Sequence, residues 1–172
     1  INQPEHKNVE NYYRELDIEN AVAVTRYMVD GVTYTRTVFS SFADDVIVVR
    51  MEADKPKALN FDLSYNSPLK HAVTAKGNEL IVKCEGAEQE GIPAALNAEC
   101  RVLVKHNGKS GKSNESVVVN HATVATLYIS AATNFVNYHD VSGNASKLVS
   151  TSLKRAVKIP YEQALANHIA AY

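Results

Sequence analysis

The stretch from Ala21 to Phe39, AVAVTRYMVDGVTYTRTVF, decides the fold because two runs rich in β-branched and aromatic residues flank Asp30-Gly31. An Asp-Gly pair between two such runs is the two-residue signal of a type I′ β-hairpin. The turn also sets the register, since Val29 must face Val32 across it. The stretch therefore predicts an antiparallel hairpin with strands at residues 21–29 and 32–39.

The predicted register gives this hairpin one mainly apolar face and one more polar face. The expected cross-strand pairs are Val29 with Val32, Tyr27 with Tyr34, Thr25 with Arg36 and Ala23 with Val38. The apolar face carries Ala23, Tyr27, Val29, Val32, Tyr34 and Val38. The opposite face carries the threonines of the second strand. Such a division is typical of an antiparallel sheet that is buried on one side.

Similar alternation and turn signals recur outward from the hairpin, so that about nine strands are expected in all. The further strands are expected at residues 45–53, 58–65, 71–76, 79–85, 98–106, 116–120 and 122–131. The run Val46-Ile47-Val48-Val49 hardly alternates, which is typical of a central strand covered on both faces. The sequence thus predicts a mainly β fold built from antiparallel sheets.

The hydrophobic period changes in the last quarter of the chain. Apolar and small residues then recur at helical spacing from Leu148 to Ala156, and Pro160 stands where a second helix is expected to begin. No helix is expected before Ser146. We therefore divide the chain into a β-sandwich domain at residues 1–145 and a helical linker segment at residues 146–172.

Composition excludes several classes of partner. The net charge is -1, and the 18 basic and 19 acidic side chains are mixed along the chain. Without a basic stripe, nucleic acid is not an expected partner. No apolar run approaches the roughly 20 residues that span a membrane, so a membrane is not expected either. The chain begins at Ile1 without an initiator Met, so we expect a mature product or an excised fragment.

The residue patterns of known catalytic and metal sites are missing from the sequence. No Gly-x-Ser-x-Gly motif occurs and the six histidines are scattered, so no catalytic residue, metal or cofactor is expected. Glycoside hydrolysis needs two carboxyl groups that face one substrate. The tight acidic pairs, Asp44-Asp45 and Glu88/Glu90, are interpreted as solvated, because adjacent residues of a strand point to opposite faces.

The two cysteines, Cys84 and Cys100, are too few for a disulfide scaffold, and their spacing matches no zinc site. The preferred interpretation is a pair of small buried hydrophobic residues. A cross-strand disulfide is the alternative, and it would fit an oxidising compartment.

One loop carries residue types that can bind a sugar. The segment 133–140, TNFVNYHD, leaves the last predicted strand with two asparagines, two aromatic residues and a histidine. Amides and imidazoles hydrogen-bond to hydroxyl groups, and aromatic rings stack on sugar rings. Asn134, Tyr138 and His139 are therefore the candidate substrate-binding residues. The competing and preferred interpretation is an ordinary loop that leaves a sheet.

Several runs of the sequence resemble a known family from about Tyr13 to the end of the chain. These are YRELDI at 13–18, YMVDGVTYTRTVF at 27–39 and DDVIVVR at 44–50, followed more weakly by AATNF at 131–135 and Tyr161…His168…Tyr172. They resemble the N-terminal domain of glycoside hydrolase family 95, the α-L-fucosidases. A proline that is usual in that pattern is replaced by Ala43 here.

The resemblance implies an antiparallel super-β-sandwich packed on a helical linker and an α/α toroid. In that family the general acid and the residues that activate water for inversion belong to the toroid, and none has a counterpart in this chain. The family's opening segment also has no counterpart, which would leave the sandwich incomplete with an open edge. The resemblance further implies that the catalytic toroid and fucosylated glycans are the partners, in a periplasmic or extracellular setting.

Three hypotheses about function follow. The first is a non-catalytic N-terminal domain of a family 95 enzyme that hydrolyses α-L-fucosyl linkages, or the closely similar α-L-galactosides. The second is a free-standing carbohydrate-binding module, which requires an exposed aromatic platform at Tyr34, Tyr65 or Tyr138. The third is a structural or adhesion sandwich without a ligand. The helical tail favours the first, because a free module is expected to end near its last strand.

Overall fold

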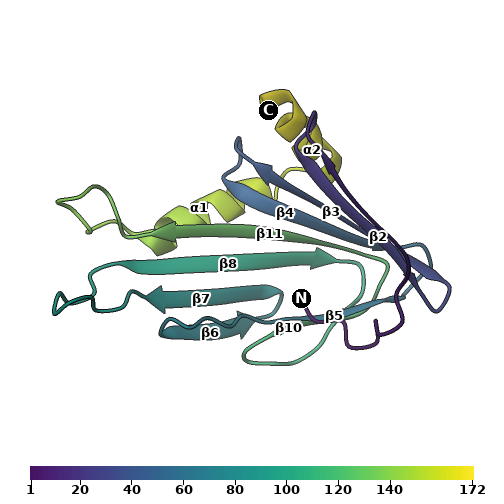
Figure 1. Cartoon of the computed structure of the whole chain (residues 1–172), viewed down its shortest axis with the longest axis horizontal. Helices are drawn as coiled ribbons and strands as arrows, with labels where there is room; N and C mark the ends of the chain where they lie inside the picture. Colours follow the sequence, from purple (N-terminus) through teal and green to yellow (C-terminus); the bar gives the residue numbers. More distant parts are fainter.

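The computed structural model of the chain describes residues 1–172 and contains two antiparallel sheets and two C-terminal helices. Figure 1 shows the helices on one side of the large sheet and the small sheet on the other. The strands are β1 (Glu10–Asp17), β2 (Val22–Val29), β3 (Val32–Ser41), β4 (Val46–Ala53), β5 (Leu59–Leu63), β6 (His71–Lys76), β7 (Glu79–Glu85), β8 (Asn97–His106), β9 (Lys109–Ser110), β10 (Val117–Ala122) and β11 (Val124–Thr133). The helices are α1 (Ala145–Ala156) and α2 (Tyr161–Ala171).

The large sheet has eight strands in the order β1-β2-β3-β4-β11-β8-β7-β6, and the small sheet has three in the order β5-β10-β9. Every pairing between neighbouring strands is antiparallel. The expected mainly β, antiparallel fold with a helical C-terminal segment is thereby confirmed.

The hairpin β2–β3 has the register that its turn predicts. Val29 pairs with Val32, Tyr27 with Tyr34, Thr25 with Arg36 and Ala23 with Val38. Asp30 and Gly31 both adopt positive φ, as a type I′ turn requires. The tyrosine rings stack with centroids 5.5 Å apart, which adds a specific cross-strand contact to the apolar face.

The main core lies between the two sheets. Leu59, Phe61 and Val119 of the small sheet pack there against Val49 and Leu127 of the large one, and all five are buried. Full burial of one such side chain contributes about 1.5–3 kcal/mol. The small sheet does not reach β1, whose residues are exposed except for Asp17 at its end.

A second core lies on the opposite face of the large sheet, under the helices. Val149, Leu153 and Ala156 of α1 pack there with Val48 of β4 and Tyr128 of β11. Since Val49 of β4 belongs to the main core, β4 is covered on both faces, as its unbroken apolar run predicts.

Local signals fix both helices. Asn144 caps α1 by accepting a hydrogen bond from the Lys147 backbone N–H at 2.9 Å, and Pro160 precedes α2. The buried His168 places Nε2 3.1 Å from the carbonyl oxygens of Asn20 and Ala21, so that Nε2 must be the donor.

Neither helix is long and apolar enough to cross a membrane.

Four details differ from the sequence-based expectations. The sequence does not predict β1, and it assigns the short β9 to a loop at residues 107–112. Leu148, expected on the apolar face of α1, is 55% exposed. The interpretation of Asp44 as a solvated carboxylate is wrong, because the residue is only 4% exposed and accepts a 2.8 Å hydrogen bond from the Ser41 hydroxyl.

Cys84 and Cys100 are both free in the structure and half-buried, packed against the main core. Cys84 of β7 pairs with Ala98 of β8, two residues before Cys100, so the two thiols are diagonal neighbours. Burial raises the pKa of the Cys100 thiol, and Cys84 adds to that shift. A raised pKa keeps the thiol protonated and unreactive.

Candidate functional site

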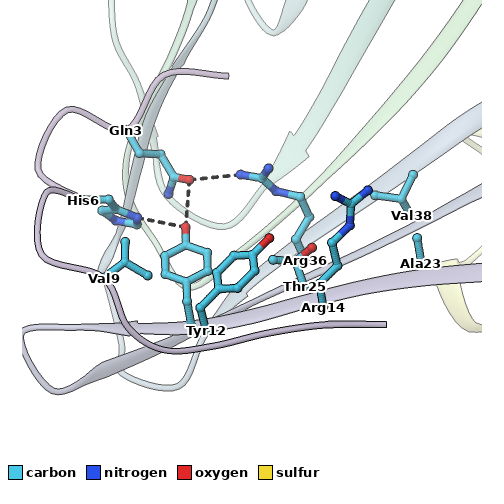
Figure 2. Close-up of a pocket in the computed structure, with 10 residues that line it drawn as sticks. Gln3, His6, Val9, Tyr12, Arg14, Ala23, Thr25, Arg36 and Val38 are labelled. Carbon is cyan, nitrogen blue, oxygen red and sulfur yellow. Dashed lines mark hydrogen bonds between the residues drawn. The ribbon is translucent and has the colours of Figure 1, made fainter. Parts of the chain in front are cut away.

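A groove of about 570 Å³ opens on the inner face of β1, β2 and β3, where the small sheet does not cover the large one. Figure 2 shows side chains from these strands rising toward residues of the N-terminal segment. The lining residues are Gln3, His6, Val9, Tyr12, Arg14, Ala23, Thr25, Tyr27, Arg36 and Val38. The volume lies within the range of about 300–1,000 Å³ that is usual for ligand sites.

A chain of hydrogen bonds ties the N-terminal segment to the floor of this groove. The Tyr27 hydroxyl donates to Gln3 Oε1 at 3.2 Å and lies 2.9 Å from His6 Nδ1, so that Nδ1 is the donor in the second contact. A terminal nitrogen of Arg36 donates to the same Gln3 oxygen at 3.2 Å. Figure 2 draws all three contacts. The bond from Arg36 to Gln3 fixes one terminal nitrogen of the arginine, and the other two bonds hold Gln3 and His6 against Tyr27.

Two donors in this cluster are buried without a partner. They are Nε2 of Gln3 and Nε of Arg36. Most buried polar groups in proteins are hydrogen-bonded, and an unpaired one costs about 1–3 kcal/mol. Both nitrogens are covered by surrounding protein atoms, so a ligand in the groove does not reach them directly.

The electrostatics of the groove favour a negative ligand. Its lining includes Arg14 and Arg36 but no carboxylate. Burial lowers the pKa of His6 below its usual value; Glu5 opposes this shift and Arg36 adds to it. Burial also raises the pKa of Tyr27, which keeps its hydroxyl protonated.

The predicted substrate-binding residues lie in another part of the molecule. In Figure 1 the loop after β11 extends at the left, whereas the N-terminal segment passes at the right. Asn134 accepts a 2.8 Å hydrogen bond from the Asn97 backbone N–H and donates to the carbonyl oxygens of Ala95 and Val141 at 3.0 and 2.8 Å. These contacts use the Asn134 amide to hold the loop.

Tyr138 and His139 form the exposed part of this loop. Tyr138 is 86% exposed, and its ring centroid lies 3.9 Å from that of His139. The Asn137 side chain accepts a 2.9 Å hydrogen bond from the His139 backbone N–H, which shapes the turn beneath them. The structure thus brings Tyr138 and His139 together at the surface and turns the Asn134 amide inward.

The acidic pairs of the sequence do not form a shared site. Asp44 is buried against Ser41, whereas Asp45 is exposed and forms an ion pair with Arg155 at 2.8 Å. Glu88 and Glu90 are exposed in the loop between β7 and β8. No group of three or more His, Cys, Asp or Glu side chains is placed to hold a metal ion.

Sequence reasoning did not identify the groove as a site. One signal for it was present, because the hairpin register places Arg36 on the face that is otherwise apolar. An arginine at such a position is costly to bury and needs a partner. The contribution of Gln3 and His6 could not be found in this way, since they come from an irregular segment that precedes β1.

Known proteins match this chain over most of its length. A solved structure described as "Putative kojibiose phosphorylase from human microbiome" superposes with a TM-score of 0.62 at 12% identity, over 95% of this chain and 24% of that one. This likeness shows a shared fold. Alpha-L-fucosidase 2 of Arabidopsis thaliana is 28% identical over 190 residues, which cover 94% of this chain and 22% of the plant protein.

The family assignment rests on the match to a family model. The model of the family described as "Glycosyl hydrolase family 65, N-terminal domain" matches residues 1–138, which include every strand of both sheets. The match supports the prediction of a glycoside hydrolase N-terminal domain. It does not support the narrower prediction of family 95, which came from the resemblance. The chain belongs to the glycosyl hydrolase family 65 N-terminal domain family.

Proposed function

We propose that this chain is a non-catalytic N-terminal domain of a larger glycoside hydrolase and that it supports a catalytic domain of the same polypeptide. The observation that carries the proposal is the match to the plant α-L-fucosidase, which extends over 94% of this chain but only 22% of the relative. The acidic pairs of the chain do not converge on a groove, which agrees with catalysis elsewhere.

The helical segment suits the role of a rigid connector. α1 and α2 pack on the outer face of the large sheet through Val149, Leu153 and Ala164, all of them buried. Arg155 of α1 adds an ion pair to Asp45, which precedes β4. A domain attached through these helices would have a fixed orientation relative to the sheet, as a supporting role requires.

We further propose that the parent enzyme hydrolyses α-L-fucosyl linkages of glycans with inversion, and that it is exported to the periplasm or beyond the cell. The resemblance to family 95 and the name of the plant relative support fucose. L-Galactose is the alternative sugar, because it differs from L-fucose by a single hydroxyl group. Residues that would distinguish the two sugars belong to the proposed catalytic domain.

The substrate test uses the polypeptide that joins this chain to its catalytic domain. Fucose release from 2′-fucosyllactose is compared with galactose release from the matching α-L-galactoside, and proton NMR follows the anomer that forms first. We expect faster fucose release with the β-anomer appearing first. Faster galactose release would identify an α-L-galactoside as the preferred substrate. An α-anomer as the first product would exclude inversion.

A free carbohydrate-binding module is the second candidate function, and the exposure of Tyr138 favours it. Of the three tyrosines considered for a platform, Tyr34 is only 8% exposed and cannot stack on a ligand. Millimolar or tighter binding of neutral fucosylated oligosaccharides by the isolated chain, lost in Tyr138→Ala, would favour this candidate over a supporting domain.

A further inference from the structure

The arginines of the groove differ from most others of the chain in lacking a carboxylate partner. Arg50, Arg101 and Arg155 each lie 2.6–3.2 Å from a carboxylate oxygen. Arg14 and Arg36 both line the groove, and neither forms an ion pair with a carboxylate. Two unpaired guanidinium groups in one groove repel each other unless an anion lies between them.

The register of the sheet places these two arginines in one row. Arg14 of β1 pairs with Thr25 of β2, and Thr25 pairs in turn with Arg36 of β3. Neighbouring strands are about 4.8 Å apart, so the two arginine Cα atoms are separated by roughly 10 Å across Thr25. Figure 2 shows both side chains rising from the sheet into the groove. An anion above Thr25 would lie within reach of both.

The free donors indicate what kind of anion fits. Gln3 holds one terminal nitrogen of Arg36, while the other terminal nitrogen of Arg36 makes no hydrogen bond and is not buried. A carboxylate supplies two coplanar acceptor oxygens, which match the fork of a guanidinium group. The Thr25 hydroxyl offers a further donor in the same row.

The rest of the groove suits the body of a sugar. Tyr12 is 61% exposed at one wall, and Val9, Ala23 and Val38 supply apolar surface beside it. A largely apolar groove with a few convergent polar groups is typical of a small-molecule site. A volume of about 570 Å³ has room for one or two sugar rings.

We propose that this groove binds a uronic acid residue of an acidic saccharide, with its carboxylate between Arg14 and Arg36 and its ring against Tyr12. The carboxylate part follows from the guanidinium groups. The saccharide part rests on the proposed function as a glycoside hydrolase domain.

The test titrates the whole chain with D-galacturonate, D-galactose, acetate and inorganic phosphate, followed by NMR or calorimetry. D-Galacturonate should bind about ten-fold more tightly than D-galactose, which lacks the charge, and than acetate, which lacks the ring. Arg14→Gln should weaken galacturonate binding about ten-fold. Arg26→Gln is the matched control, because Arg26 is exposed on the opposite face of β2. It should leave the affinity unchanged.

Distinct results would overturn the proposal. Equal affinity for acetate or phosphate would mean a bare anion site, and absence of galacturonate binding would remove the site altogether. Equal losses in Arg14→Gln and Arg26→Gln would mean a general charge effect. Equal urea midpoints for the two variants establish that both are folded. Fucose release by the parent polypeptide is measured separately, so either hypothesis can fail while the other stands.

Discussion

His6 connects the N-terminal segment to the groove, and it predicts how stability depends on pH. Burial is the largest cause of the lowered pKa of His6, whose ordinary value is 6.5. The folded chain therefore favours the neutral imidazole. Above about pH 6.5 both folded and unfolded His6 are neutral, and its contribution is fully present. As the pH falls below that value, the unfolded chain binds the proton first and the free energy of unfolding decreases.

We therefore expect the urea midpoint to decrease between pH 7.5 and 5.5, and the decrease to be smaller in His6→Gln. Glutamine can still hydrogen-bond to Tyr27 but does not titrate. His106, whose pKa burial also lowers, should keep part of the decrease. His139→Gln, in the exposed loop after β11, serves as the control and should behave like the unchanged chain. An identical slope in His6→Gln and the unchanged chain would contradict this account.

Tyr138 gives a second prediction at this scale, which follows from the sequence-based prediction that Asn134, Tyr138 and His139 bind substrate. In the parent enzyme, Tyr138→Ala should raise KM for 2′-fucosyllactose by roughly 2- to 10-fold with little change in kcat, because stacking holds bound substrate without taking part in the chemistry. Tyr172→Ala removes another exposed ring, which is 72% exposed and follows α2, and is the control. An unchanged KM in Tyr138→Ala would remove the loop from the substrate site.

Single residues were predictable where a local rule fixes them. Asp30-Gly31 set the hairpin register, which the structure confirms pair by pair. Asp44 was not predictable, because its burial depends on a hydrogen bond from Ser41 across a turn. The use of the Asn134 amide to hold its own loop also depends on partners at Ala95 and Asn97, far away in the sequence.

At the scale of elements, α1 tests whether the helices are anchored to the sheet. Both Leu153 and Leu148 belong to α1, but Leu153 is buried against the sheet and Leu148 is exposed, so they form a matched pair. Leu153→Ala should lower the free energy of unfolding by about 2–5 kcal/mol, since it leaves a cavity. Leu148→Ala should change it by less than about 0.5 kcal/mol. Chemical denaturation measures both, and equal effects would mean that α1 is not docked as described.

Elements were predictable in proportion to their burial. β4, buried on both faces, showed an unbroken apolar run, and β2 and β3 alternated. β1 has seven exposed residues out of eight and hence no apolar periodicity. β1 exists because its backbone pairs with β2. The turn between the two strands is stabilised by the Asp17 side chain, which accepts hydrogen bonds from the backbone N–H groups of Glu19 and Asn20. Pairing of this kind leaves little trace in side-chain pattern.

At the scale of the whole molecule, the unequal sheets explain where the groove lies. Eight strands face three, and the main core ends where the small sheet ends. β1 and the part of the β2–β3 inner face that carries Thr25 and Arg36 are left accessible, and the groove forms there, whereas Val29 and Tyr34 of the same face belong to the main core. Sequence patterns predicted the strands and the register of the hairpin, but not the unequal size of the sheets, since strand order depends on contacts distant in sequence.

The central claim is that this chain belongs to a glycoside hydrolase without carrying its catalytic groups. The most direct measurement is fucose release from 2′-fucosyllactose by the isolated chain, beside the polypeptide that joins it to a catalytic domain. We predict that the isolated chain releases no fucose and that the joined polypeptide does. Release by the isolated chain, at any rate above that of a heat-denatured sample, would contradict the claim and place the catalytic carboxyl groups within these 172 residues.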